Sequence, residues 1–274
     1  MERRHVEASR LVLVIGNTTT TMAIFQDGPD PLTERLPSSV FSDPAVMGET
    51  LESLVRRYAP LRDIAICSVV PDIAARCAGI FGSLCSVPVL LIGNGLRLPF
   101  TLHYENSHTF GADRIALCAW SRGLFPQQAH IAVDIGTAIT FDVLDSKGEY
   151  VGGLIMPGLD MMSSALHSRT AQLPLIKIDR STDLLGRSTG ECIRSGIFWG
   201  AVKQIGGLIG EIARHLRDEL GEPSVGVIAT GGNSPLIAAE VDSIDVVDEL
   251  AVARGSLLLL EMNSPAKQEK ELRD

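Results

Sequence analysis

The chain has 274 residues, of which 45% are hydrophobic and 21% are charged, and 33 acidic residues against 24 Lys and Arg give a formal net charge of −9. This composition predicts a globular protein of one large or two modest domains and excludes an intrinsically disordered chain, which would be poor in apolar residues. The acidic balance argues against nucleic acid as a partner, because non-specific binding of nucleic acid depends on Lys and Arg.

The sequence also indicates where the protein works. The apolar run Leu11–Ile15 follows Arg3 and Arg4 but ends at once in Gly16, so it is too short for a signal peptide. No apolar stretch approaches the roughly 20 residues that cross a bilayer, and we expect no membrane partner. Five cysteines without a C-x-x-C pair are typical of reduced thiols. We therefore expect a cytoplasmic protein.

In chain order, the first predicted elements are a strand over 12–15, a turn and a second strand over Met22–Phe25. The same pattern recurs at an offset of 120 positions, as a strand over 132–135 and another over Thr140–Leu144. The matched positions are Gly16 with Gly136, Thr20 with Thr140, Ala23 with Val143 and Gly28 with Gly148. We infer a duplicated hairpin that opens each half of the chain, with turns at Asp27-Gly28 and Lys147-Gly148.

Helices and short apolar strands alternate in the rest of the chain. The predicted helices are Ala45–Tyr58, Ser188–Leu220 and Asp248–Met262, and the predicted strands are Asp63–Val70, Val87–Ile92 and Val225–Thr230. This alternation is typical of an α/β architecture. Because Gly, Pro and Gln gather at Gly123–Gln128, we predict an N-terminal domain of residues 1–124, a C-terminal domain of 125–262 and a flexible charged tail of 263–274.

Glycine turns follow three of the predicted strands. Gly16-Asn17-Thr18 follows the first, and glycine lets the backbone approach a phosphate whose oxygens the turn's N–H groups and hydroxyls can bind. By itself this turn is more typical of an ordinary hairpin turn. Thr230-Gly231-Gly232 ends another strand and is equally compatible with a loop that leads into a helix.

The remaining glycine turn is Gly136-Thr137, and Asp134 stands just before it at the end of a predicted buried strand. Asp is disfavoured in strands and costly to bury unpaired, so either a metal ion or an N–H group of the turn would satisfy it. Three such turns in two related halves are typical of a nucleotide gripped between two domains. Neither G-x-x-x-x-G-K-[ST] nor G-x-G-x-x-G occurs, which argues against a P-loop kinase and a dinucleotide enzyme.

Further motifs follow one another in a fixed order from about Leu11 to Leu260. They are Tyr104-Glu105-Asn106, Gly111-Ala112-Asp113-Arg114, Asp134-Ile135-Gly136-Thr137-Ala138, Gly152-Gly153-Leu154-Ile155-Met156-Pro157-Gly158, Gly186-Arg187-Ser188-Thr189 and Thr230-Gly231-Gly232. Together they resemble the motifs of type III pantothenate kinases, of the superfamily of actin, hexokinase and acetate kinase. The resemblance implies an α/β fold of two ribonuclease-H-like domains with a central nucleotide cleft. It also implies ATP-dependent phosphorylation of pantothenate to 4′-phosphopantothenate, the first step of coenzyme A biosynthesis.

The resemblance assigns roles to residues as well. Asp113 would be the general base that takes the proton of the pantothenate hydroxyl. The pantothenate contacts would be Tyr104, Gly111, Ala112, Asp113, Arg114 and Thr189. The ATP contacts would be Gly16, Asn17, Thr18, Thr19, Thr20, Thr21, Thr137, Gly231 and Gly232. Asp134 would hold a monovalent cation, K⁺ or NH₄⁺, with Mg²⁺ on the phosphates. Thr189 would reach the substrate of the neighbouring subunit in a homodimer.

Other readings of the same residues stay open. Asp113-Arg114 is also compatible with a surface ion pair, and Tyr104 with a half-buried strand residue. Val14 stands where the family has the Asp of its first phosphate motif, which helps to hold Mg²⁺, and valine has no lone pair to offer. The alternative is therefore a weak or inactive relative that binds nucleotide or pantothenate and regulates a partner. A third reading is a kinase or phosphatase of this superfamily with another substrate, and the presence of Tyr104, Gly111–Arg114 and Thr189 argues against it.

Overall fold

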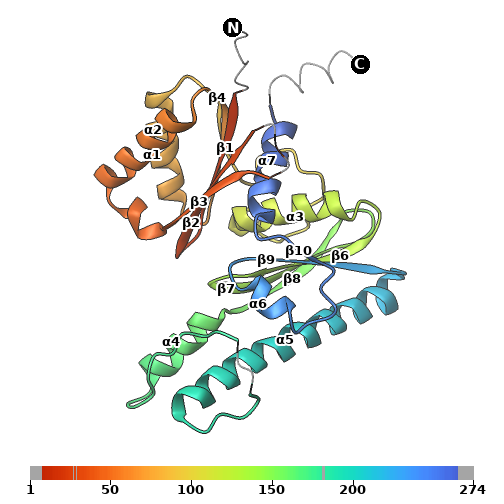
Figure 1. Cartoon of the computed structure of the whole chain (residues 1–274). Coiled ribbons are helices and arrows are strands. Elements are labelled where there is room, and N and C mark those ends of the chain that lie inside the picture. The colour runs from red at the N-terminus through yellow and green to blue at the C-terminus, as the bar shows by residue number, and fades with distance from the viewer. Residues whose placement is uncertain (1–7, 27, 29, 181–182, 265–274) are drawn as a thin grey trace. The chain divides into compact units, whose positions relative to one another are not determined.

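The computed structural model describes residues 8–26, 28, 30–180 and 183–264 (Figure 1). They form two compact units, each with one five-stranded sheet. The first unit holds the described residues of Met1–Pro99, Glu105–Trp120 and Val252–Asp274, and the second holds Phe100–Tyr104 and the described residues of Ser121–Ala251. The C-terminal helix therefore packs in the first unit, although the predicted boundaries placed it in the second half. Most of the predicted tail, residues 265–274, and the first residue of the Asp27-Gly28 turn lie outside the described residues.

The first unit is built on a sheet of strand order β3-β2-β1-β4-β5. Its strands are β1 (Ser9–Ile15), β2 (Thr19–Phe25), β3 (Leu32–Pro37), β4 (Leu61–Ser68) and β5 (Val89–Leu91). Its helices are η1 (Ser38–Ser42), α1 (Pro44–Tyr58), α2 (Pro71–Leu84), η2 (Ser107–Thr109), most of α3 (Ala112–Leu124) and nearly all of α7 (Ala251–Met262). Strand β1 is antiparallel to β2 and parallel to β4.

The core of the first unit follows from the alternation of side chains along β1. Leu11, Leu13 and Ile15 are buried in one hydrophobic cluster with Leu51 of α1 and Phe81 of α2. Helix α1 begins where the sequence predicted, because the carboxylate of its capping residue accepts hydrogen bonds from two N–H groups of the first turn and proline occupies the first helical position.

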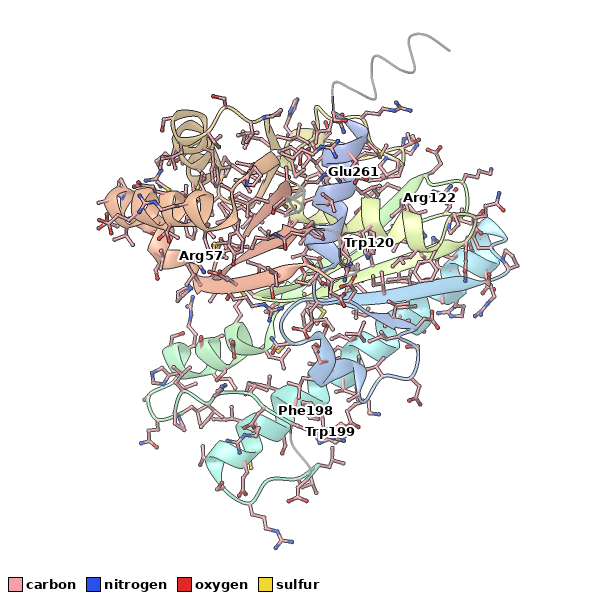
Figure 2. The ribbon with its side chains drawn as sticks, turned by 45° about the horizontal axis from the view of Figure 1, so that its top comes forward. Arg57, Trp120, Arg122, Phe198, Trp199 and Glu261 are labelled. Carbon is pink, nitrogen blue, oxygen red and sulfur yellow. The ribbon has the colours of Figure 1, made fainter. Side chains whose placement is uncertain are left out.

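Helix α7 packs directly against α3 in the first unit. A Cβ atom on Gly255 would overlap the carbonyl group of Ala116, so the two helix backbones touch at this point. Glu261, labelled in Figure 2, forms an ion pair with Arg10 of β1 and ties the end of α7 to the sheet. The contact explains why a glycine stands in the middle of an otherwise apolar helix.

The second unit is built on a sheet of strand order β10-β9-β6-β7-β8. Its strands are β6 (Ala129–Ile135), β7 (Ala138–Leu144), β8 (Tyr150–Pro157), β9 (Val225–Thr230) and β10 (Val246–Val247). Its helices are α4 (Leu159–Arg169), α5 (Thr189–Leu220) and α6 (Ser234–Ala238). Read from β8, the order and direction of its strands repeat those of the first sheet. This repetition confirms the predicted α/β fold of two ribonuclease-H-like halves.

The two opening hairpins differ by one residue in their turns. In the first, the Gly16 N–H donates to the Thr19 carbonyl, three residues on; in the second, the Gly136 N–H donates to a carbonyl only two residues on. The offset of 120 therefore falls to 119 after the turn, and the predicted matches of Thr20 with Thr140 and of Ala23 with Val143 are wrong. Thr20 is fully buried whereas Thr140 is half-buried, because a shift of one residue exchanges the faces of a strand.

Helix α5 covers the core face of the second sheet. Its start is fixed by a capping box, in which Ser188 accepts from the Glu191 N–H and the Glu191 carboxylate accepts from the Ser188 N–H. Gly221 ends it in the left-handed conformation, with φ of 69°. Phe198 is fully buried, and its ring meets that of Trp199 edge to face at 5.0 Å between centroids (Figure 2).

Two further observations concern the cysteines and the helices. All five cysteines are free, and burial raises the pKa of the Cys77 thiol to about 11. That thiol is therefore protonated and unreactive at neutral pH. Among the described helices, none combines the length and the apolar character that a membrane span requires.

His130 is a fully buried titratable group at the start of β6. Its Nδ1 lies 2.9 Å from the carbonyl oxygen of Gln128 and donates to it, and its ring stacks on that of Phe125 at 5.6 Å between centroids. Burial lowers the pKa of His130 from 6.5 to about 4, an effect that the hydrogen bond to Gln128 only partly opposes. The imidazole is therefore neutral in the folded protein at neutral pH.

We predict that the free energy of unfolding depends on pH through His130. Between pH 6.5 and about 4 the unfolded chain takes up a proton that the folded protein does not, so stability falls as the pH is lowered through this window. The expected loss is roughly 2–3 kcal/mol. Urea unfolding across this range measures it, with His130→Phe as the comparison; a variant that loses as much stability as the wild type over the window would contradict this assignment.

Candidate functional site

The turn between β1 and β2 is the first glycine turn of the first unit. Three of the predicted ATP contacts are exposed there, namely Asn17, Thr18 and Thr19. Ser38 braces the turn from η1, because its N–H donates to the Thr18 carbonyl at 2.9 Å and its hydroxyl donates to the Gly16 carbonyl at 2.7 Å. The hydroxyl of Thr20 is buried against that of Ser38 at 2.9 Å, so Thr20 supports the turn from inside, whereas Thr21 is half-buried.

No sequence pattern pointed to Ser38, because it lies 22 positions after the glycine whose carbonyl it binds. Val14 lies just before the turn, half-buried and paired with Thr21 across the hairpin. It faces away from the Leu13 and Ile15 side chains that enter the core. The equivalent strand position of the second unit is that of Asp134, so the fold accepts either residue there.

The start of α3 is the second feature of the first unit. Asp113 stands in the first turn of the helix, and its Oδ1 accepts from the Arg114 N–H at 2.8 Å. A Cβ on Gly111 would overlap the Asp113 carboxylate, so a larger residue there would push the carboxylate out of this position. The Arg114 guanidinium lies 4.3 Å from the centroid of the buried Phe110 ring, and Arg114 as a whole is 8% exposed. Ala112 begins the helix between Gly111 and Asp113.

The electrostatics of this segment favour a proton acceptor. Burial raises the pKa of the Asp113 carboxyl above its usual 3.8, while the hydrogen bond from the Arg114 N–H and the Arg114 charge act in the opposite direction. A carboxylate whose pKa is raised by burial is a stronger base than an exposed one. Asp113 and Arg114 are therefore not the exposed surface pair that the sequence also allowed.

Three glycines meet around the β6–β7 turn of the second unit. Gly136 forms the turn, and added Cβ atoms on Gly158 and Gly231 would overlap the turn carbonyls or the Asp134 carboxylate. Gly231 has φ of +91°, a conformation that favours glycine. Thr137 is exposed at the tip of the turn. The structure thus brings Asp134, Thr137 and Gly231 together, and it adds Gly158, which the sequence showed only as part of a motif.

The β6–β7 turn offers oxygen donors to a cation. Oδ1 of Asp134 is buried beside Gly136 and Gly231, and the turn adds carbonyl and hydroxyl oxygens. In the part of the chain that the structure describes, no three His, Cys, Asp or Glu side chains gather as a metal site. Mg²⁺ is commonly held by one or two carboxylates together with phosphates and water, so the donor set fits a cation that a bound phosphate also ligates.

Two predicted pantothenate contacts lie in the second unit. Tyr104 is 38% exposed, and its ring meets the ring of Tyr150 edge to face, with 6.1 Å between centroids. Thr189 is exposed at the first position of α5, where the capping contacts are made by its neighbours Ser188 and Glu191. The pairing of Tyr104 with Tyr150 was not predicted, because no spacing in the sequence links the two.

Comparison with known proteins gives a consistent result. A family model described as type III pantothenate kinase matches residues 10–211. A type III pantothenate kinase of Chlorobaculum tepidum is 59% identical over 256 residues, 93% of this chain and 95% of that protein. One of Chlorobaculum parvum is 58% identical over 255 residues, again 93% and 95%. The crystal structure of a conserved Baf family protein from Campylobacter jejuni matches the fold with a TM-score of 0.55 at 20% identity, covering 92% of this chain and 98% of that one.

Proposed function

The chain belongs to the type III pantothenate kinase family, and from this premise we propose that it transfers the γ-phosphoryl group of ATP to the hydroxyl of pantothenate. The product is 4′-phosphopantothenate, and the reaction opens coenzyme A biosynthesis in the cytoplasm. The observation that carries the proposal is the half-buried carboxylate of Asp113 at the start of α3, packed over Gly111 and next to Arg114.

Asp113 is the proposed general base. In phosphoryl transfer the protein positions the nucleophile and stabilises charge, and a carboxylate within hydrogen-bond reach accepts the proton of the attacking hydroxyl. Burial has raised the pKa of Asp113, so its carboxylate holds that proton more readily than an exposed one would. Gly111 leaves the carboxylate its space, and the N–H of Arg114 fixes the orientation of one of its oxygens.

Pantothenate has a carboxylate that Arg114 is suited to bind. A guanidinium can donate two parallel hydrogen bonds to a carboxylate, and stacking on the Phe110 ring limits the directions in which it points. We propose that Tyr104, Gly111 and Ala112 contact the rest of the substrate. Because the side chain of Arg114 is mostly shielded from water, its ion pair with a substrate carboxylate would be little screened.

We propose that each unit contributes its glycine turns to ATP. In the first unit these are the N–H groups and side chains of 17–19, while Gly16 closes the turn through its hydrogen bond to the Thr19 carbonyl and Thr20 and Thr21 act as support. In the second unit they are Thr137 and the Gly231-Gly232 turn, where the open space beside Gly232 lets a phosphate approach the backbone. Asp134 would hold the cation that accompanies the phosphates, Mg²⁺ or a monovalent K⁺ or NH₄⁺. Bound there, the metal neutralises phosphate charge.

We also propose a homodimer. Strand β8 is an edge of its sheet, and it exposes Val151, Leu154 and Ile155, the last at 65%. An exposed apolar edge strand is unusual unless something covers it. Next to it, a cavity of about 520 Å³ is lined mainly by apolar groups of β8, α4 and α5. A second copy on this surface would cover both features, and Thr189 at the start of α5 would be free to reach the other copy's substrate.

The proposal is tested by an ADP-release assay with ATP, pantothenate, Mg²⁺ and K⁺, in which we expect pantothenate-dependent turnover by the wild type. Because Val14 supplies no ligand, we predict that Val14→Asp lowers the Mg²⁺ concentration for half-maximal rate by about 10-fold or more. Val14→Asn is the matched control, because Asn has the size of Asp but no charge. It should change the Mg²⁺ concentration for half-maximal rate much less than Val14→Asp does. The second unit has Asp at the equivalent position, so the fold should accept the substitution.

Two results would contradict these expectations differently. If the wild type shows no turnover and Val14→Asp does, the result would favour the alternative function, an inactive relative that binds ligand and regulates a partner. Equal Mg²⁺ dependence of the wild type and Val14→Asp would show instead that the first strand takes no part in holding the metal.

A further inference from the structure

The short segment that ends at Tyr104 is fastened to the turn between β7 and β8. The Thr101 N–H donates to the Gly148 carbonyl and the Tyr150 N–H donates to the Thr101 carbonyl, both at 2.9 Å. The Thr101 hydroxyl donates to a carboxylate oxygen of Glu149 at 3.2 Å, and His103 bonds the other oxygen of the same carboxylate. This backbone and side-chain pairing fixes the chain up to the residue before Tyr104.

The side chain of Tyr104 rests on a second, buried arrangement. Its ring meets the ring of Tyr150 at 6.1 Å between centroids and 72° between planes, a favourable edge-to-face geometry. Tyr150 is 3% exposed, and its hydroxyl donates to Oδ1 of Asp142 at 3.0 Å. Asp142 is fully buried in β7. A buried carboxylate requires hydrogen-bond donors, so this bond holds the Tyr150 ring in one direction.

The register of the sheet relates this arrangement to the phosphate turn. Asp142 pairs with Ala132 across β6 and β7, and Asp134 pairs with Thr140. Asp142 and Asp134 therefore lie on the same face of the second sheet, the face opposite the core residues Phe141 and Val133. Asp142, which holds Tyr150 beneath Tyr104, thus lies on the same face as Asp134, the candidate cation ligand. Its Oδ1 atom accepts the hydrogen bond of the Tyr150 hydroxyl.

We propose that Tyr150 and Asp142 are positioning residues, which hold the ring of Tyr104 in the orientation that contacts pantothenate. This role rests on the proposed function, because it takes Tyr104 as a substrate contact. The hydrogen bond of Tyr150 to Asp142 fixes the Tyr150 ring, and the edge of one ring against the other limits the rotation of Tyr104. Tyr104 is 38% exposed, so part of the residue is accessible to a substrate.

The kinetic test is a double-mutant cycle. Tyr150→Phe keeps the ring and removes the hydroxyl, and it should raise the KM for pantothenate about 3-fold to 10-fold with the KM for ATP unchanged. In a Tyr104→Ala background the same change should have no further effect on the KM for pantothenate. Asp142→Ala removes the acceptor of the Tyr150 hydrogen bond and should raise the KM for pantothenate in the same direction as Tyr150→Phe, with the KM for ATP unchanged. The positioning role would be overturned if Tyr150→Phe raised the KM for pantothenate by the same factor in the wild type and in Tyr104→Ala. It would also be overturned if the KM for ATP rose in parallel with the KM for pantothenate.

A second readout does not depend on activity. The chain has three tyrosines, so protein labelled with 3-fluorotyrosine gives three fluorine resonances, which Tyr104→Phe and Tyr150→Phe assign directly. In Tyr150→Phe the resonance of Tyr104 should shift, while that of Tyr58 on α1 stays as an internal control. An unmoved Tyr104 resonance overturns the positioning role, whereas a wild type that does not phosphorylate pantothenate overturns the proposed function.

Discussion

Replacing Asp113 with Asn is expected to lower kcat by about 10²-fold to 10⁴-fold, the contribution usual for a general base. Asn has the size of Asp but cannot accept the proton of the attacking hydroxyl. Because burial raises the pKa of Asp113, the wild-type kcat/KM should fall at acid pH through an apparent pKa above 3.8, as the carboxylate becomes protonated. Steady-state assays across pH measure both effects.

The control for this variant is its stability. The ionised Asp113 carboxylate is penalised by burial, so removing its charge should leave the Tm unchanged or higher, and the KM for ATP should stay near that of the wild type. A well-folded Asp113→Asn enzyme with more than about a tenth of the wild-type kcat would be incompatible with Asp113 as the base.

Gly255→Ala should destabilise the protein by about 3 kcal/mol or more, because the added methyl group would overlap the carbonyl group of Ala116, and a backbone cannot move aside as a flexible side chain can. Helix α3 would be displaced with its first turn, which holds Asp113, so kcat should fall too. Urea unfolding measures the change in the free energy of unfolding.

The matched control lies in the same unit. Gly79 stands inside α2 with open space around its α-carbon, so Gly79→Ala adds a methyl group without a clash. It should be neutral or stabilise the protein by up to about 1 kcal/mol through helix propensity. If Gly255→Ala unfolds at the same urea concentration as Gly79→Ala, the close packing of α3 on α7 is not present in solution.

Local patterns in the sequence were sufficient for the elements with strong signals. The predicted helices Ala45–Tyr58 and Ser188–Leu220 match α1 and α5 within one residue, because caps and long periodic segments mark them. The strand Val225–Thr230 is confirmed without change. The predicted helix from Asp248 begins only at Ala251, since element ends are weakly encoded.

What the sequence could not supply were relations between distant segments. The match of Thr20 with Thr140 failed because the second turn is one residue shorter than the first. The sequence did not reveal this difference in turn length, because both hairpins happen to have threonine at the same offset. The bracing of the first turn by Ser38 and the support of Tyr104 by Tyr150 depend on tertiary contacts that no periodicity records. The site roles taken from the family resemblance stay predictions, with local geometry now attached to each.

The central claim is that this chain phosphorylates pantothenate, and mass spectrometry of the products tests it most directly. After incubation of the wild-type protein with pantothenate, ATP, Mg²⁺ and K⁺, we predict that pantothenate gains one phosphoryl group at its hydroxyl and that ADP forms in equal amount. Pantothenate recovered unchanged, or ADP formed without phosphorylated pantothenate, would contradict the account.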